Sequence, residues 1–280
     1  MAKTINEYRR IDERTLRPRC FVDKNDLESK VIVQEVDKIE KKGKMKVKEY
    51  IEYFAPNNVG ILLSKMNKSI RTAKTIYSKK INLMYNSKEI FDDLAILNTK
   101  IIYNYIEEIQ TAIVFGYTAL EAFSNLSIPE KYVYTAKPNS KGIVEAFDKM
   151  AIERWTQLKT KLSEILPEIY KTGDIKKEKL WNNFMKLEET RNSIIHQKTI
   201  EKTEFYNTYF SKEIFDILEV PETIIKYFYE NNKAENKEVL TLWPWLINTN
   251  RDFYIEEIAN PSDFMNEKEL NDFLSKKRKK

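Results

Sequence analysis

The sequence contains little glycine, cysteine or histidine. Five glycines and eight prolines among 280 residues are few, which argues against a strand-rich fold with many tight turns. The single cysteine, Cys20, excludes an intramolecular disulfide, and one cysteine with one histidine cannot supply the four ligands of a structural zinc site. No cluster of histidine, cysteine or carboxylate residues has metal-ligand spacing, so we predict no metal and no cofactor.

Long apolar runs are also missing. No stretch approaches the roughly 20 apolar residues that cross a bilayer, and residues 1–7 lack the apolar core of a signal peptide. Both observations predict a cytoplasmic protein with no membrane partner. The 48 basic and 43 acidic residues give a net charge of +5, which permits nucleic-acid binding without indicating it. Basic residues are concentrated at 9–19 and in the tail at 276–280.

The composition favours a mainly α protein. Hydrophobic residues make up 42% of the chain, enough for a core, and stretches rich in lysine, glutamate, isoleucine and leucine predict helices. We expect a small N-terminal α+β extension at 1–87, a helical domain at 88–230, and a C-terminal helical extension with a basic tail at 231–280.

The N-terminal region differs from the rest of the chain. Residues 45–53 alternate in polarity and follow the apolar run at 31–33, which predicts a β-hairpin around Gly43. The stretch at 59–85 fits either a helix or strands.

One long helix is predicted next. Apolar residues recur at every third or fourth position from Ile90 to Leu126. Ser87 or Asn86 can cap the start of this helix, and Pro129 ends it. Small residues on this helix would let another helix approach closely: Ala112, Gly116 and Ala119.

Shorter helices are expected after it. Their predicted ranges are 142–166, 174–197, 211–231 with a break at Pro221, and 267–274. A turn is expected from Pro167 to Gly173. The Trp243-Pro244-Trp245 segment fits a buried loop anchor, or a stacking platform for bases.

The only histidine, His196, lies five residues after Arg191, near the predicted end of the helix at 174–197. Histidine is the side chain whose unperturbed pKa allows proton transfer near neutrality, and arginine presents a planar fork of donors that matches a phosphate. These two residue types can break an RNA phosphodiester without a metal. Asn192, four residues before His196, is its neighbour on the helix surface.

A helical projection places Arg191 in the apolar stripe of its helix, between Leu187 and Ile194. A charged residue there needs a partner or a cavity, and Glu188, three residues earlier, is a local candidate. His196 lies about 140° further around the helix. Because this angle keeps the two side chains apart, we expect two copies related by a two-fold axis to supply both groups to a shared cleft.

Arg191, Asn192 and His196 resemble the signature of the HEPN superfamily of all-helical prokaryotic ribonucleases. That signature is an arginine, a polar residue, about three further residues and a histidine near a helix end. Residues 118–125, with the Ile-Pro-Glu that follows at 128–130, are similar to the long first helix of defence-associated members. The resemblance covers about residues 88–230 and implies a HEPN-like helical bundle.

The chain departs from the family at one position. Members that an adenylating partner neutralises carry a tyrosine two residues after the histidine, where this chain has Lys198. The resemblance still implies a metal-independent endoribonuclease, acting as a homodimer on tRNA or other host RNA, as a toxin or antiphage effector. An antitoxin or regulatory partner would fit such a role.

The resemblance assigns a role to each motif residue. His196 would be the general base or acid, Arg191 would hold the scissile phosphate, and Asn192 would orient His196 or donate to the phosphate. The alternative is a non-catalytic helical module that binds a nucleotide or a protein partner. In its simplest form Arg191 pairs with Glu188 and His196 interacts with the helix dipole. Glu121 is either a buried partner of a cation or faces solvent.

Overall fold

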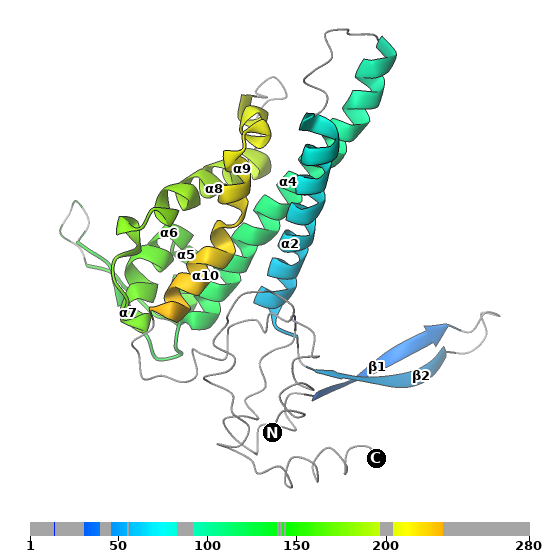
Figure 1. Cartoon of the computed structure of the whole chain (residues 1–280). Coiled ribbons are helices and arrows are strands. Elements are labelled where there is room, and N and C mark those ends of the chain that lie inside the picture. The colour runs from blue at the N-terminus through cyan, green and yellow to red at the C-terminus, as the bar shows by residue number, and fades with distance from the viewer. Residues whose placement is uncertain are drawn as a thin grey trace, which may run out of the picture. The chain divides into compact units, whose positions relative to one another are not determined.

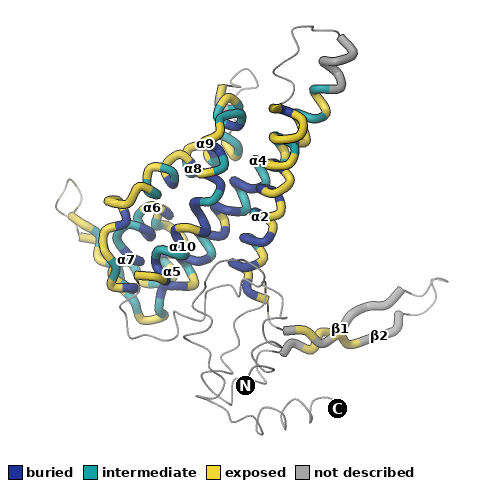
Figure 2. The backbone as a smooth tube through the Cα atoms, in the orientation of Figure 1, coloured by how far each residue is buried: buried dark blue, intermediate teal, exposed yellow. Residues whose placement is uncertain are grey.

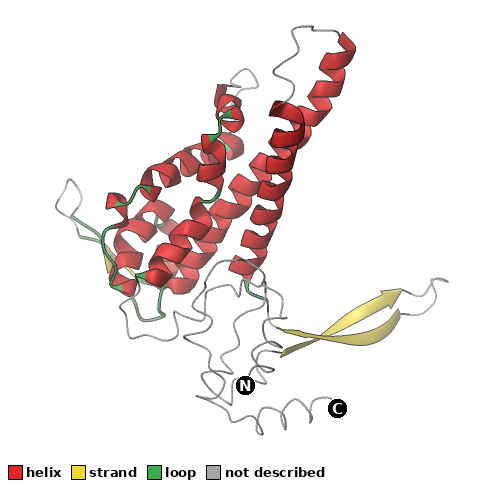
Figure 3. Ribbon diagram, in the orientation of Figure 1, coloured by secondary structure: helices red, strands yellow, loops and turns green. Residues whose placement is uncertain are grey.

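The computed structural model describes residues 14, 31–39, 46–54, 56–82, 92–138, 140, 142, 144–196 and 204–231. Contacts between residues divide the chain into two compact units, one formed by Met1–Gly60 with Thr241–Lys280 and the other by Ile61–Leu240. The described residues are predominantly helical (Figure 3), which confirms the prediction of a mainly α protein. Several predicted features lie outside the described residues: the helix cap at Ser87, the turn at Gly43, the Trp243–Trp245 segment, the helix at 267–274 and the basic tail.

The first unit contains the predicted β-hairpin. Strands β1 (Val31–Ile39) and β2 (Lys46–Phe54) pair antiparallel, with Val31 opposite Phe54. The hydroxyl of Tyr53 donates to Gln34 Oε1 at 3.2 Å across the strands. The alternating polarity at 45–53 therefore predicted this element correctly.

The stretch at 59–85, which fits helix or strand by sequence, is helical as far as residue 82. Helix α2 (Asn58–Ile76) begins after Asn57, whose Oδ1 accepts from the backbone N–H of Val59 at 3.0 Å. A π-helical turn, η4 (Tyr77–Ile81), follows it. Residues 61–82 belong to the helical unit, whereas the sequence groups them with the N-terminal extension.

Helix α4 (Asp92–Ser127) is the longest element of the second unit and contacts α8, α9 and α10, which lie along it in Figure 1. It ends two residues before Pro129, as the sequence predicts. The small residue Gly116 lets neighbouring elements come close, since a Cβ there would lie 2.8 Å from Met66 Sδ and 2.9 Å from Pro221 Cγ. The expected close approach at this residue is confirmed.

The prediction of a single helix at 142–166 is wrong. Gly142 has a left-handed φ of +74°, and residues 146–147 form strand β4 (Ala146–Phe147), paired with β3 (Tyr134–Thr135). Asp148 caps α5 (Lys149–Trp155), which ends where Thr156 becomes extended. The helical path then resumes as α6 (Leu158–Thr160), the π-helical turn η5 (Lys161–Ile165) and α7 (Leu166–Tyr170).

The predicted turn at 167–173 starts later than expected, because Pro167 occupies the first turn of α7, where its missing N–H costs nothing. The chain turns at Lys171, which has a φ of 51°. Asp174 then caps a short 3-10 turn, η6 (Ile175–Lys177), rather than the helix that carries the motif. That helix, α8 (Leu180–Ile195), begins after Glu178, which is extended and interrupts the helical path.

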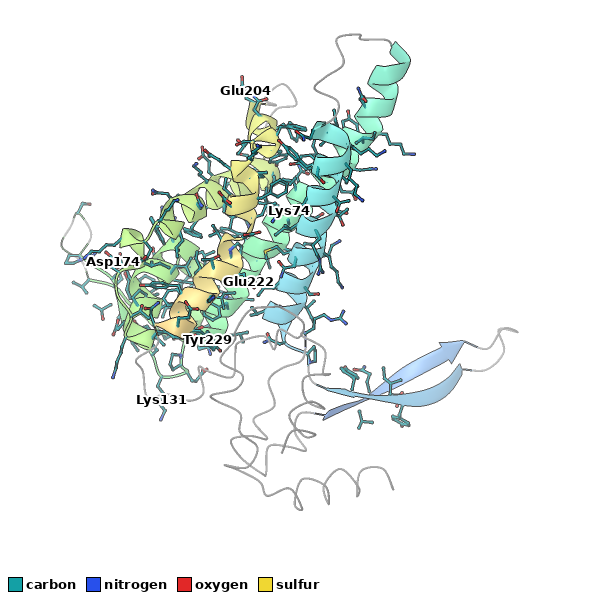
Figure 4. The ribbon with its side chains drawn as sticks, viewed as in Figure 1. Lys74, Lys131, Asp174, Glu204, Glu222 and Tyr229 are labelled. Atoms are coloured by element: carbon teal, nitrogen blue, oxygen red, sulfur yellow. The ribbon has the colours of Figure 1, made fainter. Side chains whose placement is uncertain are left out.

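A 3-10 segment, η7 (Glu204–Phe210), precedes the last two described helices, α9 (Glu213–Leu218) and α10 (Val220–Glu230). The break between them lies at Glu219, one residue before α10 and two before Pro221, close to the predicted position. Two polar contacts join this junction to α2: Lys74 Nζ lies 2.7 Å from Glu219 Oε1, and Asn67 donates to Glu222 at 3.3 Å. Lys74 and Glu222 are labelled in Figure 4.

The core lies between α4 and α10, whose buried stretches appear dark blue in Figure 2. Its centre is aromatic: Phe123, Tyr170 and Phe228 have ring centroids 5.4 to 6.2 Å apart. The hydroxyl of Tyr170 is satisfied by Ser127 at 2.9 Å. This packing anchors α4, the helix against which α8 packs.

Candidate functional site

Helix α8 carries the motif on the surface of the helical unit. Phe184, Leu187 and Thr190 are buried and form the side that packs toward the unit. Met185, Asn192 and His196 are exposed on another side, and Asn192 and His196 are neighbours there, as their spacing predicts. Packing of α8 within one compact unit therefore fixes the backbone from which the candidate site residues extend.

Arg191 is half-buried, and its charge faces an aromatic ring. The guanidinium carbon lies 4.8 Å from the centre of the Tyr117 ring on α4. Its Nη1 donates to Asn192 Oδ1 at 3.0 Å. Among the described ion pairs there is none between Arg191 and Glu188, so the local pairing considered from the sequence is not formed.

Glu188 instead accepts a hydrogen bond from the hydroxyl of Tyr117, at 3.1 Å. Tyr117 is 6% exposed. Burial raises the pKa of the Tyr117 hydroxyl, and the charge and hydrogen bond of Glu188 raise it further, so the phenol stays protonated. One tyrosine therefore contacts the arginine of the motif with its ring and the neighbouring carboxylate with its hydroxyl.

Tyr117 is not among the site residues that the sequence predicts. One feature of the sequence could have indicated Tyr117: a tyrosine inside the apolar stripe of a long helix needs a hydrogen-bond partner for its hydroxyl. The sequence alone does not reveal that the partner lies on α8, because 71 positions separate Tyr117 from Glu188.

His196 is the C-cap residue of α8. Its backbone N–H donates to Asn192 O at 2.9 Å, and its side chain is exposed. The predicted position of the histidine near the end of its helix is confirmed.

Asn192 and His196 line one shallow groove of about 560 Å³ along α8, wide open to solvent. The lining consists of Met185, Glu188, Glu189, Asn192, Ser193 and His196. We call this the motif groove. Arg191 does not line this groove. Its guanidinium, however, donates a hydrogen bond to Asn192, which does line it. The three motif residues are thus linked to one groove, although Arg191 and His196 leave the helix about 140° apart.

A second groove, of about 870 Å³, lies along α4 and includes Ile194 and Tyr206. Ile195 is 50% exposed beside His196, and Met185 is 38% exposed in the motif groove. Helix α8 therefore carries exposed apolar side chains as well as the polar motif.

Glu121, considered from the sequence as a partner for a cation, is half-buried one turn after Tyr117 on α4. Its charge acts on Tyr117 and on Lys161, a lysine that is only 4% exposed. Lys161 Nζ donates to Asn125 Oδ1 at 2.7 Å and to the backbone oxygen of Glu153 at 3.2 Å. Burial lowers the pKa of Lys161, and the charges of Glu121 and Glu153 oppose that shift.

Two further observations concern the described residues as a whole. None of their helices has the length and apolar character needed to span a bilayer. Within the same residues, no group of three or more histidine, cysteine or carboxylate side chains is arranged to hold a metal ion.

Comparisons of the chain with protein-family models, with curated proteins and with solved structures found no match.

Proposed function

We propose that the chain is a metal-independent endoribonuclease of the HEPN type, with Arg191, Asn192 and His196 as its catalytic residues. The observation that carries the proposal is the link between these residues: Arg191 donates to Asn192, and Asn192 shares the motif groove with His196. A permanent cation and an exposed proton-transfer group are thus both linked, through Asn192, to a groove that is open to solvent and to an RNA phosphate.

The chemistry requires both groups. The ribose 2′-oxygen attacks phosphorus as its proton passes to a base, and the 5′-oxygen leaves as it receives a proton from an acid. The product is a 2′,3′-cyclic phosphate. Arg191 would stabilise the extra negative charge on the phosphate oxygens in the transition state, with Asn192 holding its fork.

The need for a base and an acid together favours a dimer. The chain has one histidine, so a single copy supplies one imidazole, while two copies facing each other supply two. The exposed apolar side chains of Met185 and Ile195, on the helix that carries the motif, suit burial against a second copy. We expect a homodimer by light scattering at micromolar concentration; a strict monomer would contradict the shared site.

The decisive experiment is cleavage of RNA by the purified full chain. We expect activity that survives EDTA and yields products ending in 2′,3′-cyclic phosphate. His196→Ala should lower cleavage by roughly 10²-fold or more while RNA affinity and melting temperature change little. Loss of activity in chelator, restored by magnesium, would contradict a catalyst made of Arg191 and His196.

The biological role follows from the resemblance and belongs to the same proposal. Such a ribonuclease would act in the cytoplasm as a toxin or antiphage effector on tRNA or other host RNA, under the control of an antitoxin or regulatory partner. Expression of the wild-type chain should then arrest growth, and His196→Ala should relieve the arrest.

A second candidate function is a non-catalytic helical module that binds a protein partner. The observation in its favour is charge: Glu188 and Glu189 line the motif groove and disfavour an RNA phosphate there. If this reading holds, the wild-type chain will cut no RNA and its expression will not arrest growth.

A further inference from the structure

An arginine that grips a phosphate must be held in place without losing its charge. A neighbouring carboxylate would fix the side chain but would also offset the positive charge that attracts the phosphate. The face of an aromatic ring fixes a guanidinium through the ring quadrupole and leaves the net charge intact. In this structure the guanidinium of Arg191 lies over the Tyr117 ring, 4.8 Å from its centre.

Tyr117 is itself held firmly. It belongs to α4, the longest helix of the unit, and it is only 6% exposed. Its hydroxyl donates to Glu188 Oε1 at 3.1 Å. Glu188 lies one turn before Arg191 on α8, so the hydroxyl engages the carboxylate that would otherwise be the nearest partner of the arginine.

The direction of the fork matters as much as its charge. The N–H donors of a guanidinium lie in its plane, so a ring beneath one face leaves the edge available to an anion. Here one edge donor of Arg191 already reaches Asn192 Oδ1, at 3.0 Å, and Asn192 lines the motif groove. The ring contact and this hydrogen bond together hold the guanidinium beside a residue that lines the groove.

We propose that Tyr117 is a positioning residue for Arg191: its ring holds the guanidinium, and its hydroxyl, bonded to Glu188, fixes the ring. The identity of the bound group, an RNA phosphate, rests on the proposed function; the positioning itself rests on the contacts of Tyr117. The ring is the essential part, and the hydroxyl supports it.

Two variants separate the ring from the hydroxyl. Tyr117→Phe keeps the ring face but frees Glu188, so it should lower cleavage by only about threefold, far less than loss of the ring does. Tyr117→Leu removes the ring and should lower kcat/KM roughly ten- to a hundredfold, because a misplaced fork no longer meets the phosphate. Tyr132→Leu is the matched control, since Tyr132 also donates its hydroxyl to a glutamate, Glu168 Oε2 at 2.7 Å. It should lower stability without lowering cleavage.

A spectroscopic readout tests the positioning without any activity. Protons over a ring face resonate upfield, so the δ-protons of Arg191 should be shifted upfield in the wild-type chain relative to those of Arg154, which is exposed on α5. The shift should persist in Tyr117→Phe and vanish in Tyr117→Leu. The wild-type spectrum alone gives this test even if a variant fails to fold.

Each outcome decides one of the two proposals. An unshifted Arg191 in the wild-type chain overturns the positioning role, and so does equal loss of cleavage in Tyr117→Phe and Tyr117→Leu. If Arg191 shows the ring shift but the wild-type chain cuts no RNA, the ribonuclease proposal fails and the positioning of Arg191 stands.

Discussion

The ring of Tyr117 lies beneath the guanidinium of Arg191, while the hydroxyl of the same tyrosine donates to Glu188. This arrangement keeps a half-buried arginine apart from the carboxylate three residues before it. A guanidinium in contact with a ring keeps its full charge, whereas one paired with a carboxylate forms a locally neutral unit. The finding therefore bears directly on whether Arg191 can attract a phosphate.

The first prediction concerns the shape of the cation at position 191. We expect Arg191→Lys to lose RNA cleavage nearly as fully as Arg191→Ala, because an ammonium group is a point charge and cannot reproduce the planar fork. Single-turnover rates on one RNA substrate would measure this. Arg154→Lys, on an exposed turn of α5, is the control and should leave the rate unchanged. Full activity in Arg191→Lys would mean that charge alone suffices.

A second prediction concerns Gly116, where α4 meets Met66 and Pro221. A Cβ would lie 2.8 Å from Met66 Sδ and 2.9 Å from Pro221 Cγ, and the proline ring cannot move aside as a flexible side chain can. Gly116→Ala should therefore destabilise the protein by about 1–3 kcal/mol, despite the better helix propensity of alanine.

Gly173→Ala is the matched control for Gly116→Ala. The nearest atom to a Cβ at Gly173 is the hydroxyl oxygen of Tyr227, at an ordinary contact distance of 3.7 Å. Urea denaturation of both variants would test the pair. Equal or greater stability in Gly116→Ala would show that the helices can separate at little cost.

Much of the fold was predictable because its signals are local. The β-hairpin follows from alternation at 45–53, and the end of α4 follows from Pro129. The helix predicted at 142–166 failed because one polar cap, Asp148, and one extended residue, Thr156, break a sequence that otherwise has helical composition. Such breaks depend on the packing of the flanking segments and leave little trace in periodicity.

The candidate site was predictable only in part. The positions of Asn192 and His196 on one face follow from their spacing of four along a helix. The partner of Arg191 does not, because Tyr117 belongs to another helix and contacts it through the fold. From the sequence, the candidate partner of Arg191 was its near neighbour Glu188. In the structure Glu188 accepts a hydrogen bond from Tyr117 instead.

A third prediction concerns the buried lysine Lys161. Its ammonium satisfies Asn125 Oδ1 and the backbone oxygen of Glu153. Lys161→Met would leave these two acceptors without that donor, so we expect the free energy of unfolding to fall by about 1–3 kcal/mol. Lys149→Met is the control: the half-buried Lys149 lies 3.5 Å from the exposed Glu130 carboxylate and 3.9 Å from that of Glu153, and such solvent-accessible ion pairs contribute little.

Chemical denaturation of the two lysine variants at neutral pH would measure this difference. If Lys161→Met is as stable as wild type, removing a buried charge offsets the loss of its hydrogen bonds. Equal losses in both variants would instead point to a general effect of net charge.

The last prediction concerns alkaline pH. Burial raises the pKa of Tyr170, and burial with a hydrogen bond to Glu164 raises the pKa of Tyr134 to about 12. In the unfolded chain a tyrosine titrates near 10. A folded-state pKa above the unfolded one contributes stability that is fully present below about pH 10 and is lost as pH rises through the folded pKa. The free energy of unfolding should therefore fall as pH rises above about 10.

Tyr170→Phe tests that contribution, because it removes a fully buried phenol while keeping the ring. The variant should be less stable than wild type at pH 8, since the contact with Ser127 is lost, but its stability should fall less steeply between pH 10 and 11. Tyr103→Phe, at an exposed position of α4, is the control and should follow the wild-type curve. Denaturant titrations at several pH values would measure the slopes, and parallel curves for Tyr170→Phe and wild type would show that this tyrosine does not ionise on unfolding in that range.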